Sequence, residues 1–496
     1  MKSFRRLAPR DWIGLALVLA GVILRLRQYL TDRSLWLDEA MLANNILGRN
    51  FAGLFQPLDN NQGAPIGFLL LQKSITLILG TSEYALRLFP LAAGLFALAA
   101  MFLLMRQVAK PFAGMLALAL FAVAPALVYY ASEVKQYSSD VAIALGLCLL
   151  YLTYAQAQLK PRDAVLLTGA GILAMWFSHP ALFIVAALGL ALFIPAARAK
   201  NKQQIITLLV LAAVWMLSLG VLYFVNLRQL STHQFFLDYW AVGFLPHSAS
   251  ALTWLVNALH APFHDLLGLR MIYALAALFF LIGFIALTRR LPRFGLLLLL
   301  TFFFSLLASF LTLYPFAGRM ILFLSPILIL LLAEGIEAAA GWLPSAWLAW
   351  TARVLLAGYL LFGPLAASTE NFLAPKYQEH IRPTMQYLRD YRKPGDLVYV
   401  YYWAAHAVRY YGPKYGMSMS DFIIGQDHHD DPAAYHAELN ALRGHTRVWF
   451  LFSHVYENGN FNERDYILNY LNSIGRELRE YRVPGTSVYL YLYDLQ

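Results

Sequence analysis

Two adjacent acids, Asp38 and Glu39, follow the first long apolar segment of the chain, within the stretch Ser-Leu-Trp-Leu-Asp-Glu-Ala at 34–40. Acids at a membrane surface are costly to keep there, so they indicate a function by default. A carboxylate in this position can take a proton from an acceptor hydroxyl, and general-base assistance contributes typically about 10²–10⁴ in rate. The alternative is a structural role, because Ser34 and Asp38 both suit helix starts.

A second polar segment, Tyr-Tyr-Ala-Ser-Glu-Val-Lys-Gln-Tyr at 129–137, lies between two apolar runs. Glu133 is a second candidate acid, and Lys135 can hold a phosphate as a point charge. The alternative is an aromatic belt at the membrane interface that includes a Glu–Lys pair.

Three further residues are candidates for binding an anionic group. His179, in Ser-His-Pro at 178–180, either packs in a turn or contacts a phosphate or acceptor. Arg319 comes directly before an apolar run and opposes the inside bias of basic residues, so it needs an anionic partner. Arg87 either binds phosphate as well or pairs with Glu83.

Two histidine patterns are weak indications of a metal site. His260 and His264 have the i, i+4 spacing of two ligands on one helix face, but no third ligand follows in a recognised motif, which favours a solvated loop. The run Asp-His-His-Asp-Asp at 427–431 can bind a cation, although a surface loop is the simpler interpretation. The single cysteine, Cys148, excludes a Cys-based metal site. We predict no resident metal, with a divalent cation left open as a cofactor.

The composition indicates a helical membrane protein. Of the 496 residues, 60% are hydrophobic and 13% are charged, whereas soluble domains are typically about 45–50% apolar and about 25% charged. Apolar runs of about 20 residues recur, as a hydrocarbon core of roughly 30 Å requires. The net charge of +10 is explained by Lys and Arg residues that set the orientation in the membrane, rather than by nucleic-acid binding.

Basic clusters between the runs predict about eleven transmembrane helices, with the N-terminus inside. The predicted spans are 12–29, 85–105, 111–130, 141–154, 164–177, 181–196, 205–225, 271–287, 294–313, 320–340 and 347–367. The segment 64–79 is short and has polar residues in its middle, so we predict an interfacial or re-entrant helix on the outer face. Arg25, near the outer end of the first span, either snorkels or faces an anionic ligand.

The composition changes near residue 371, where charges, Pro and Gly rise and the apolar runs shorten to strand length. We expect a membrane domain over 1–370, with outer-face juxtamembrane helices in 31–81, and a small α/β domain over 371–496. An odd number of spans places this second domain outside. We predict strands at 397–402, 447–452 and 487–493, helices at 383–392, 404–411 and 463–481, and a turn at 393–396.

The chain resembles the GT-C glycosyltransferases, in particular the bacterial branch related to protein O-mannosyltransferases and to the aminoarabinose transferases of lipid A. Segments 34–40 and 129–137 resemble the first-loop and second-loop motifs of that family. Residues 63–69 resemble its juxtamembrane helix, and residues 82–88 resemble the entry to its second span. The Ser-His-Pro segment, Gly318-Arg319 and the turn at 393–396 follow in the expected order. The likeness covers the membrane half well and the C-terminal domain loosely.

This resemblance implies a polyprenyl-phosphate sugar donor and transfer to a glycan, lipid or protein acceptor on the outer face of the cell (inner) membrane, by a multi-pass protein. Carried over, Asp38 is the base with Glu39 beside it, and Glu133 is a second acid of the site. The candidate phosphate ligands are Lys135, Arg319, Arg87 and His179. The candidates for an acceptor or sugar pocket are Trp36, Tyr130 and Tyr137.

Two departures from the family pattern are visible. Lys135 stands where the family usually has Arg, which gives up bidentate phosphate geometry. Gly63-Ala64 replaces the usual His-Pro, so any role of that His is absent. The alternative function is a polytopic transporter or flippase of lipid-linked glycans, which predicts charges deep inside spans or broken, repeated helices.

Overall fold

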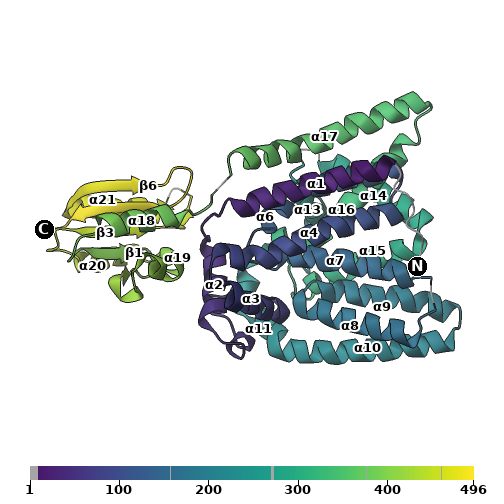
Figure 1. The fold of residues 1–496 in the computed structure, drawn as a ribbon, viewed down its shortest axis with the longest axis horizontal. Helices are drawn as coiled ribbons and strands as arrows, with labels where there is room; N and C mark the ends of the chain where they lie inside the picture. The colour runs from purple at the N-terminus through teal and green to yellow at the C-terminus, as the bar shows by residue number, and fades with distance from the viewer. Residues whose placement is uncertain (1–8, 157, 270–272, 376, 460) are drawn as a thin grey trace. The chain divides into compact units, whose positions relative to one another are not determined.

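The computed structural model describes residues 9–156, 158–269, 273–375, 377–459 and 461–496. The chain divides into two compact units (Figure 1). The helical unit comprises Met1–Thr31 and Phe51–Ala374, and the sheet unit comprises Asp32–Asn50 and Pro375–Gln496. Segment 32–50, expected from the sequence in the membrane half, therefore groups with the C-terminal residues.

The helical unit is a bundle of long helices joined by short helical turns (Figure 1). In chain order the elements are α1 (Pro9–Leu30), η1 (Gly53–Phe55), α3 (Ile66–Leu79), α4 (Glu83–Val108), α5 (Pro111–Val123), α6 (Pro125–Tyr130), α7 (Tyr137–Tyr154), α8 (Pro161–Phe177), α9 (Ala181–Arg198), α10 (Lys202–Leu222), η2 (Tyr223–Leu227), α11 (Arg228–Thr232), α12 (Gln234–Tyr239), η3 (Ala241–Gly243), α13 (Ala251–Asp265), α14 (Tyr273–Arg290), α15 (Pro292–Phe310), η4 (Gly318–Leu324), α16 (Ser325–Ala340) and α17 (Ala346–Leu373).

Eight described helical segments are long and apolar enough to cross a membrane, so the chain is a multi-pass membrane protein. They are Asp11–Leu30, Glu83–Val108, Tyr137–Tyr154, Ala181–Arg198, Lys202–Thr232, Pro292–Phe310, Gly318–Ala340 and Ala346–Leu373. The other three predicted spans contain α5 with α6, α8 and α14. Residues 271 and 272 of one predicted span lie outside the described residues. The predicted interfacial segment forms α3, an apolar helix of 14 residues.

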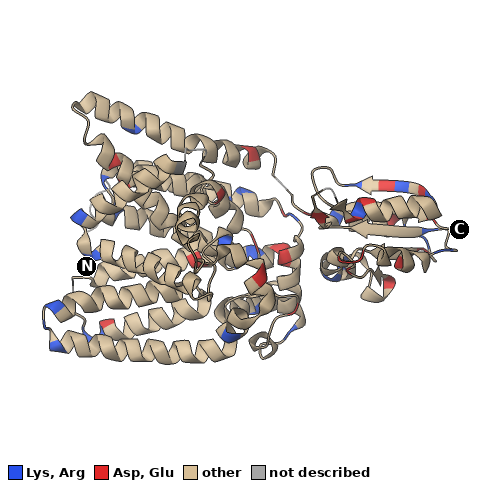
Figure 2. Cartoon of the chain, turned by 180° about the vertical axis from the view of Figure 1, so that it is seen from behind, with Lys and Arg blue, Asp and Glu red and all other residues tan. Residues whose placement is uncertain are grey.

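The charged residues of the helical unit lie mostly toward the ends of its long helices (Figure 2). Two ion pairs join neighbouring helices there. Arg290 of α14 lies 2.7 Å from Glu334 of α16, and Arg353 of α17 lies 2.7 Å from Glu337 of α16. Pairing of this kind is how ionisable groups are accommodated in membrane-spanning segments.

α14 and α16 approach each other closely through glycine. A Cβ atom placed on Gly283 would lie 1.8 Å from the Leu331 carbonyl oxygen, and one on Gly335 would lie 1.8 Å from the Phe279 carbonyl oxygen. Small residues allow such backbone contact between membrane helices, where packing replaces the hydrophobic effect as the driving force.

We expect Gly335→Ala to destabilise the protein, because the added methyl group must push α14 and α16 apart. Overpacking of this kind costs typically about 1–3 kcal/mol. Gly358→Ala in α17 is the matched control, since a Cβ atom there meets nothing within 4 Å. Thermal unfolding of both variants in the same detergent checks the prediction, and equal midpoints would contradict the close packing.

Arg25 is buried in α1 and supports the end of α5, which replaces both sequence-based interpretations of this residue. Its guanidinium donates to the carbonyl oxygens of Ala122 at 3.1 Å and Phe121 at 3.3 Å. These carbonyls belong to the last turn of α5, where backbone acceptors lack partners within the helix. A cation at a helix C-terminus is also favoured by the helix dipole.

The sheet unit contains the small α/β domain expected from the sequence. Its elements are α2 (Leu37–Gly48), α18 (Ile381–Tyr391), β1 (Leu397–Val400), η5 (Tyr402–Ala404), α19 (Ala405–Tyr411), η6 (Gly412–Tyr415), η7 (Met419–Asp421), β2 (Ile423–Ile424), α20 (Ala434–Asn440), β3 (Val448–Phe452), β4 (Glu457–Asn458), β5 (Phe461–Asn462), α21 (Glu463–Ile474), β6 (Arg476–Arg482) and β7 (Tyr489–Asp494). The main sheet has the order β2-β1-β3-β7-β6, in which β1 is parallel to β2 and β3, and β7 is antiparallel to β3 and β6.

The predicted helix over 463–481 is wrong in its second half, where residues 476–482 form strand β6. Gly475 separates the two elements in an extended conformation, and a Cβ atom there would lie 2.3 Å from the Asp494 carbonyl oxygen. β6 is an exposed edge strand whose acids and bases alternate with few gaps (Figure 2). Charged side chains protect such an edge from pairing with other chains. The same charges suit an exposed helix, which is why the sequence predicted one here.

The predicted turn at 393–396 is confirmed, and Asp396 is its central polar group. Gly395 has a left-handed φ of 88°, which glycine adopts without strain. The Asp396 carboxylate accepts hydrogen bonds from Arg447 Nε at 2.7 Å, Trp449 Nε1 at 2.8 Å and the Lys393 amide at 3.0 Å. Burial opposes ionisation, but these donors outweigh it and lower the pKa of Asp396 below its ordinary value.

Asp396→Asn should lower the free energy of unfolding by about 1.5–3 kcal/mol at pH 7, because hydrogen bonds to charged groups contribute about that much. The folded-state pKa is depressed, so this stabilisation is complete above the ordinary pKa of about 3.9 and is lost as the pH falls through the folded value. Wild type and variant should therefore converge in acid. Unfolding of the full-length protein between pH 3 and 7 measures this, with the exposed Asp431→Asn as control. A constant difference across that range would contradict the assignment.

Candidate active site

The acidic segment is anchored within the sheet unit. The Leu37 amide donates to Glu379 Oε2 at 2.9 Å, so a carboxylate from a distant segment satisfies the start of α2. The Leu35 amide donates to the Tyr411 hydroxyl at 2.8 Å, and α2 packs against α19. These contacts fix the helix that carries the two acids.

Neither Ser34 nor Asp38 is the N-cap of α2. The N-cap is Trp36, which makes no side-chain cap bond, and Asp38 lies in the first turn. Ser34 Oγ instead accepts a hydrogen bond from the Arg382 amide at 3.3 Å and lies 2.9 Å from His380 Nδ1. Ser34 therefore supports the start of α18, and capping does not account for Asp38.

The two acids have different surroundings. Glu39 is fully buried and lies 3.9 Å from the buried guanidinium of Arg33. Separating a buried pair by removing one partner is strongly destabilising, so the ion pair with Arg33 holds Glu39 in the fold. Asp38 and Trp36 are partly exposed. Asp38 is thus the more accessible of the two acids.

In the helical unit, the 129–137 segment joins α6 to α7 and receives Arg319 from η4. The rings of Tyr130 and Tyr137 meet edge to face with centroids 5.1 Å apart. The Arg319 guanidinium carbon lies 5.6 Å from the centre of the Tyr137 ring and 6.0 Å from that of Trp240. Cation–aromatic contacts orient a guanidinium without neutralising it. The tertiary structure therefore brings Arg319 to this segment, as expected from the sequence.

Lys135 is buried in the same segment, with 4% of its surface exposed. Its Nζ donates to Gln62 Oε1 at 2.6 Å, and the fully buried Glu133 lies two positions earlier in the chain. Gln62 follows Asn60 and Asn61, whose φ angles of 60° and 51° are left-handed. Asn tolerates this conformation better than most residues, and the resulting bend presents Gln62 to Lys135.

A cavity of about 60 Å³ lies beside Gln62 in the helical unit. Asn226, Gln229 and His233 supply further polar lining, and Leu54, Leu58, Leu69, Leu230 and Phe236 supply apolar lining. Lys135 therefore bonds to a residue that also lines an open space with several hydrogen-bonding groups. The space is well below the roughly 300–1,000 Å³ of typical ligand pockets, so by itself it has room for little more than water.

His179 is buried and holds the wall of this cavity. Its Nε2 lies 2.7 Å from Asn226 Oδ1, and Asn226 Nδ2 donates to the Ala64 carbonyl oxygen at 3.5 Å. Burial lowers the pKa of His179 to about 4, although the Asn226 bond acts in the opposite direction. The ring is therefore mainly neutral near pH 7, and it contributes a hydrogen-bonding group rather than a fixed charge to this wall.

Arg87 is 2% exposed and lies one turn into α4, close in sequence to the buried Glu83. Ser82 Oγ accepts from the Ala85 amide at 3.2 Å and caps this helix. A buried guanidinium must be compensated by acceptors, so the position of Arg87 fits either an ion pair or an anionic ligand.

Asp140 is a buried acid of α7 that the sequence interpretation missed. Its Oδ1 makes no hydrogen bond of normal geometry among the described residues. It lies near Tyr314. Burial raises the pKa of the Tyr314 hydroxyl, and the charges of the neighbouring Asp140 and Tyr137 raise it further. An acid near the start of an apolar helix is itself a signal of function. Gln62 carries no such signal, because only the fold brings it to the lysine.

The two histidine patterns lie in different units of the chain. Among the described residues, no group of three or more His, Cys, Asp or Glu side chains could hold a metal ion. His260 and His264 lie on helix α13 rather than in the expected loop. In the 427–431 run, His429 pairs with Asp427.

The ten candidate residues are divided between the two units. Trp36, Asp38 and Glu39 belong to the sheet unit, and Arg87, Tyr130, Glu133, Lys135, Tyr137, His179 and Arg319 belong to the helical unit.

No protein-family model matches the chain, and no curated protein matches its sequence. Solved structures match its fold. ArnT from Cupriavidus metallidurans in the apo state is similar with a TM-score of 0.52 and 13% identity, over 96% of this chain and 97% of that chain. ArnT bound to undecaprenyl phosphate is similar with a TM-score of 0.54 and 13% identity, over 98% of each chain.

An oligosaccharyltransferase from Archaeoglobus fulgidus, in complex with Zn and sulfate, is similar with a TM-score of 0.51 and 15% identity, over 88% of this chain and 67% of that chain. At identities this low, the structural likeness establishes a common fold alone. The coverage of the ArnT structures extends that fold to nearly the whole chain. The protein therefore has the GT-C type of fold expected from the sequence, a polytopic helical membrane protein with a small C-terminal α/β domain.

Proposed function

We propose that this protein is an integral-membrane glycosyltransferase that moves a sugar from a polyprenyl-phosphate-linked donor to an acceptor on the outer face of the cell membrane. The observation that carries the proposal is the pair of cations at the start of α7. Lys135 is buried beside Gln62, and Arg319 lies over Tyr137, the first residue of that helix. The two side chains place two positive charges beside the first turn of α7, where they can attract an anionic group.

A phosphate group fits this place for two physical reasons. The start of a helix presents unpaired backbone amides and the positive end of the dipole, both of which favour an anion. Charge-assisted bonds from Lys and Arg then hold the phosphate oxygens and stabilise the negative charge that grows as the leaving group departs. The likeness to ArnT bound to undecaprenyl phosphate supports a polyprenyl phosphate as the donor lipid.

In the proposed reaction, an acceptor hydroxyl attacks the anomeric carbon of the sugar. The bond from that carbon to the phosphate oxygen breaks, and polyprenyl phosphate leaves with the electron pair. The carboxylate of Asp38 takes the hydroxyl proton, as a partly exposed acid can. Glu133 is the second acid, and Trp36, Tyr130 and Tyr137 supply aromatic contacts for acceptor or sugar.

The direct test is turnover. Purified full-length protein in lipid nanodiscs is incubated with polyprenyl-phosphate donors that carry radiolabelled hexoses or pentoses. We expect release of polyprenyl phosphate, with the label passing to an acceptor or to water. A transporter or flippase would instead move the intact donor across the bilayer of a proteoliposome, so movement without release would replace the proposal by that alternative.

A further inference from the structure

The parallel part of the sheet in the sheet unit has the topology of a ligand-binding edge. β1 is central, the chain passes from β1 to β2 on one side, and it then crosses to β3 on the other side. In open α/β sheets, ligands bind outside the carboxyl ends of the strands at such a reversal of strand order. The segments that leave β1, β2 and β3 at this edge begin at Tyr401, Gly425 and Ser453.

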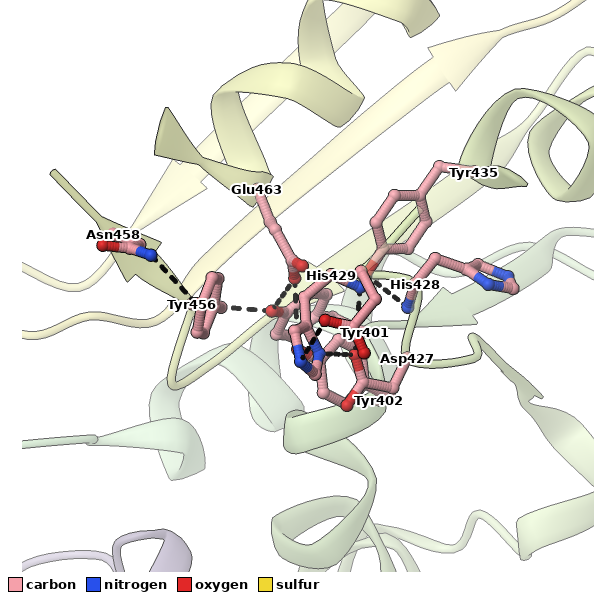
Figure 3. Close-up of polar contacts among 10 residues, drawn as sticks. Tyr401, Tyr402, Asp427, His428, His429, Tyr435, Tyr456, Asn458 and Glu463 are labelled. Atoms are coloured by element: carbon pink, nitrogen blue, oxygen red, sulfur yellow. Dashed lines mark hydrogen bonds and ion pairs between the residues drawn. The ribbon is translucent and has the colours of Figure 1, made fainter. Parts of the chain in front are cut away.

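These segments carry a connected polar cluster (Figure 3). Tyr401 and Tyr402 donate to Glu463 Oε2, the latter at 3.2 Å, and the Tyr456 amide donates to the Tyr401 hydroxyl at 3.1 Å. Asp427 bonds to His429 at 2.5 Å. All of these groups come from the ends of parallel strands or from the start of α21, which is where the topology predicts a ligand.

The carboxylate of Glu463 is the buried centre of the cluster. The residue is fully buried, yet Oε1 accepts no hydrogen bond of normal geometry among the described residues. The Tyr435 hydroxyl lies near it and accepts a bond from the His428 amide at 3.2 Å. A polar group so deeply buried normally satisfies all its acceptors. The Tyr435 side chain also interacts with Glu463, and Oε1 is left without a short hydrogen bond among the described residues.

The outer part of the cluster is aromatic and partly exposed. Tyr402, Trp403 and Tyr456 are partly buried, and the side chains of His429 and His454 are 37% and 43% exposed. The His429 ring lies 5.2 Å from the Tyr456 ring, and the Trp403 ring lies 6.0 Å from the His454 ring. Aromatic faces carry negative charge density and attract the C–H hydrogens of a bound ring.

The charges at this edge favour a neutral ligand. Hydrogen bonding to Asp427 raises the pKa of His429, which favours a protonated ring whose charge would offset that of the neighbouring carboxylate. A phosphate would meet the carboxylates of Asp427 and Glu463, and a metal lacks the necessary group of ligands among the described residues. Hydroxyl groups match the available acceptors without adding charge.

We propose that the carboxyl edge of β1, β2 and β3 is a saccharide-binding site, in which the sugar ring lies on the exposed aromatic side chains and its hydroxyls bond to Tyr402, Asp427 and Glu463. Tyr402 donates to the Glu463 carboxylate in the structure, so a change of rotamer at this partly exposed side chain would open the carboxylate to the ligand. The site uses sheet-unit residues alone, so it does not depend on the transfer reaction proposed above.

The test is saturation-transfer NMR and affinity titration of the full-length protein with methyl α-glycosides of mannose, glucose and galactose, without any lipid-linked donor. We expect at least one glycoside to bind wild type, and Glu463→Gln and Tyr402→Phe to weaken it at least 10-fold. Glu480→Gln on the exposed edge strand β6 is the matched control and should bind normally.

Three outcomes would overturn the proposal. They are no binding of any neutral glycoside to wild type, binding that persists unchanged in both cluster variants, and binding of the cationic sugar glucosamine alone. If Glu463→Gln fails to fold, Tyr402→Phe decides the question, because this side chain is partly exposed and loses a single hydroxyl group. A cluster that is purely structural would lower the unfolding temperature of the variants without any glycoside raising that of wild type.

Discussion

Asp38→Asn should lower the turnover of lipid-linked donor by at least about 100-fold. The substitution keeps the shape of the side chain but removes the proton acceptor, and loss of general-base assistance costs about 10²–10⁴ in rate. Asp38 makes no N-cap bond for α2, so folding should persist. Donor affinity should also persist, because the carboxylate acts on the acceptor. A fall in kcat with an unchanged donor Kd is therefore the expected signature.

The control for this experiment is Asp390→Asn, an equal change at an exposed acid of the sheet unit that pairs with its neighbour Arg389. It should transfer sugar at the wild-type rate. Near-normal transfer by Asp38→Asn would assign the base to another acid, and Glu133 is then the first to test. Loss of transfer together with a lower unfolding temperature would show that Asp38 is needed for structure instead.

Arg319→Ala should weaken binding of polyprenyl phosphate by about 10-fold to 100-fold, since a charge-assisted bond contributes roughly 1.5–3 kcal/mol. The effect differs from that of Asp38→Asn because it falls on the binding of the donor lipid itself. Arg319→Lys should be intermediate, since it keeps the charge but loses the planar fork that bonds two phosphate oxygens. Titration of undecaprenyl phosphate into nanodisc-embedded protein measures both.

The matched control is Arg162→Ala, at an exposed arginine near the start of α8. It removes the same charge from the helical unit and should leave the affinity unchanged. Equal affinities for wild type and Arg319→Ala would exclude Arg319 from the phosphate site. Equal losses in both variants would mean that the net charge of the protein, rather than a local contact, governs binding of the lipid.

The order and type of the elements were largely predictable from the sequence. Each predicted span contains a helix, because the thickness of a hydrocarbon core demands a long apolar run and such a run needs no tertiary context to be recognised. The turn at 393–396 was equally visible, since Pro394 restricts the backbone locally and Gly395 permits the left-handed φ of the turn. The polar segments at 34–40 and 129–137 stood out because polar groups are costly beside a membrane.

The tertiary structure alone decided how these parts meet. Lys135 bonds to Gln62, and Arg25 bonds to the end of α5, across sequence separations that no local pattern encodes. Residues 476–482 became a strand because Gly475 and pairing with β7 prevailed over a helical charge pattern. The segment 32–50 joined the C-terminal unit through bonds such as Leu37 to Glu379. Local propensities act over a few residues, whereas hydrogen bonds and close packing between distant segments depend on the whole fold.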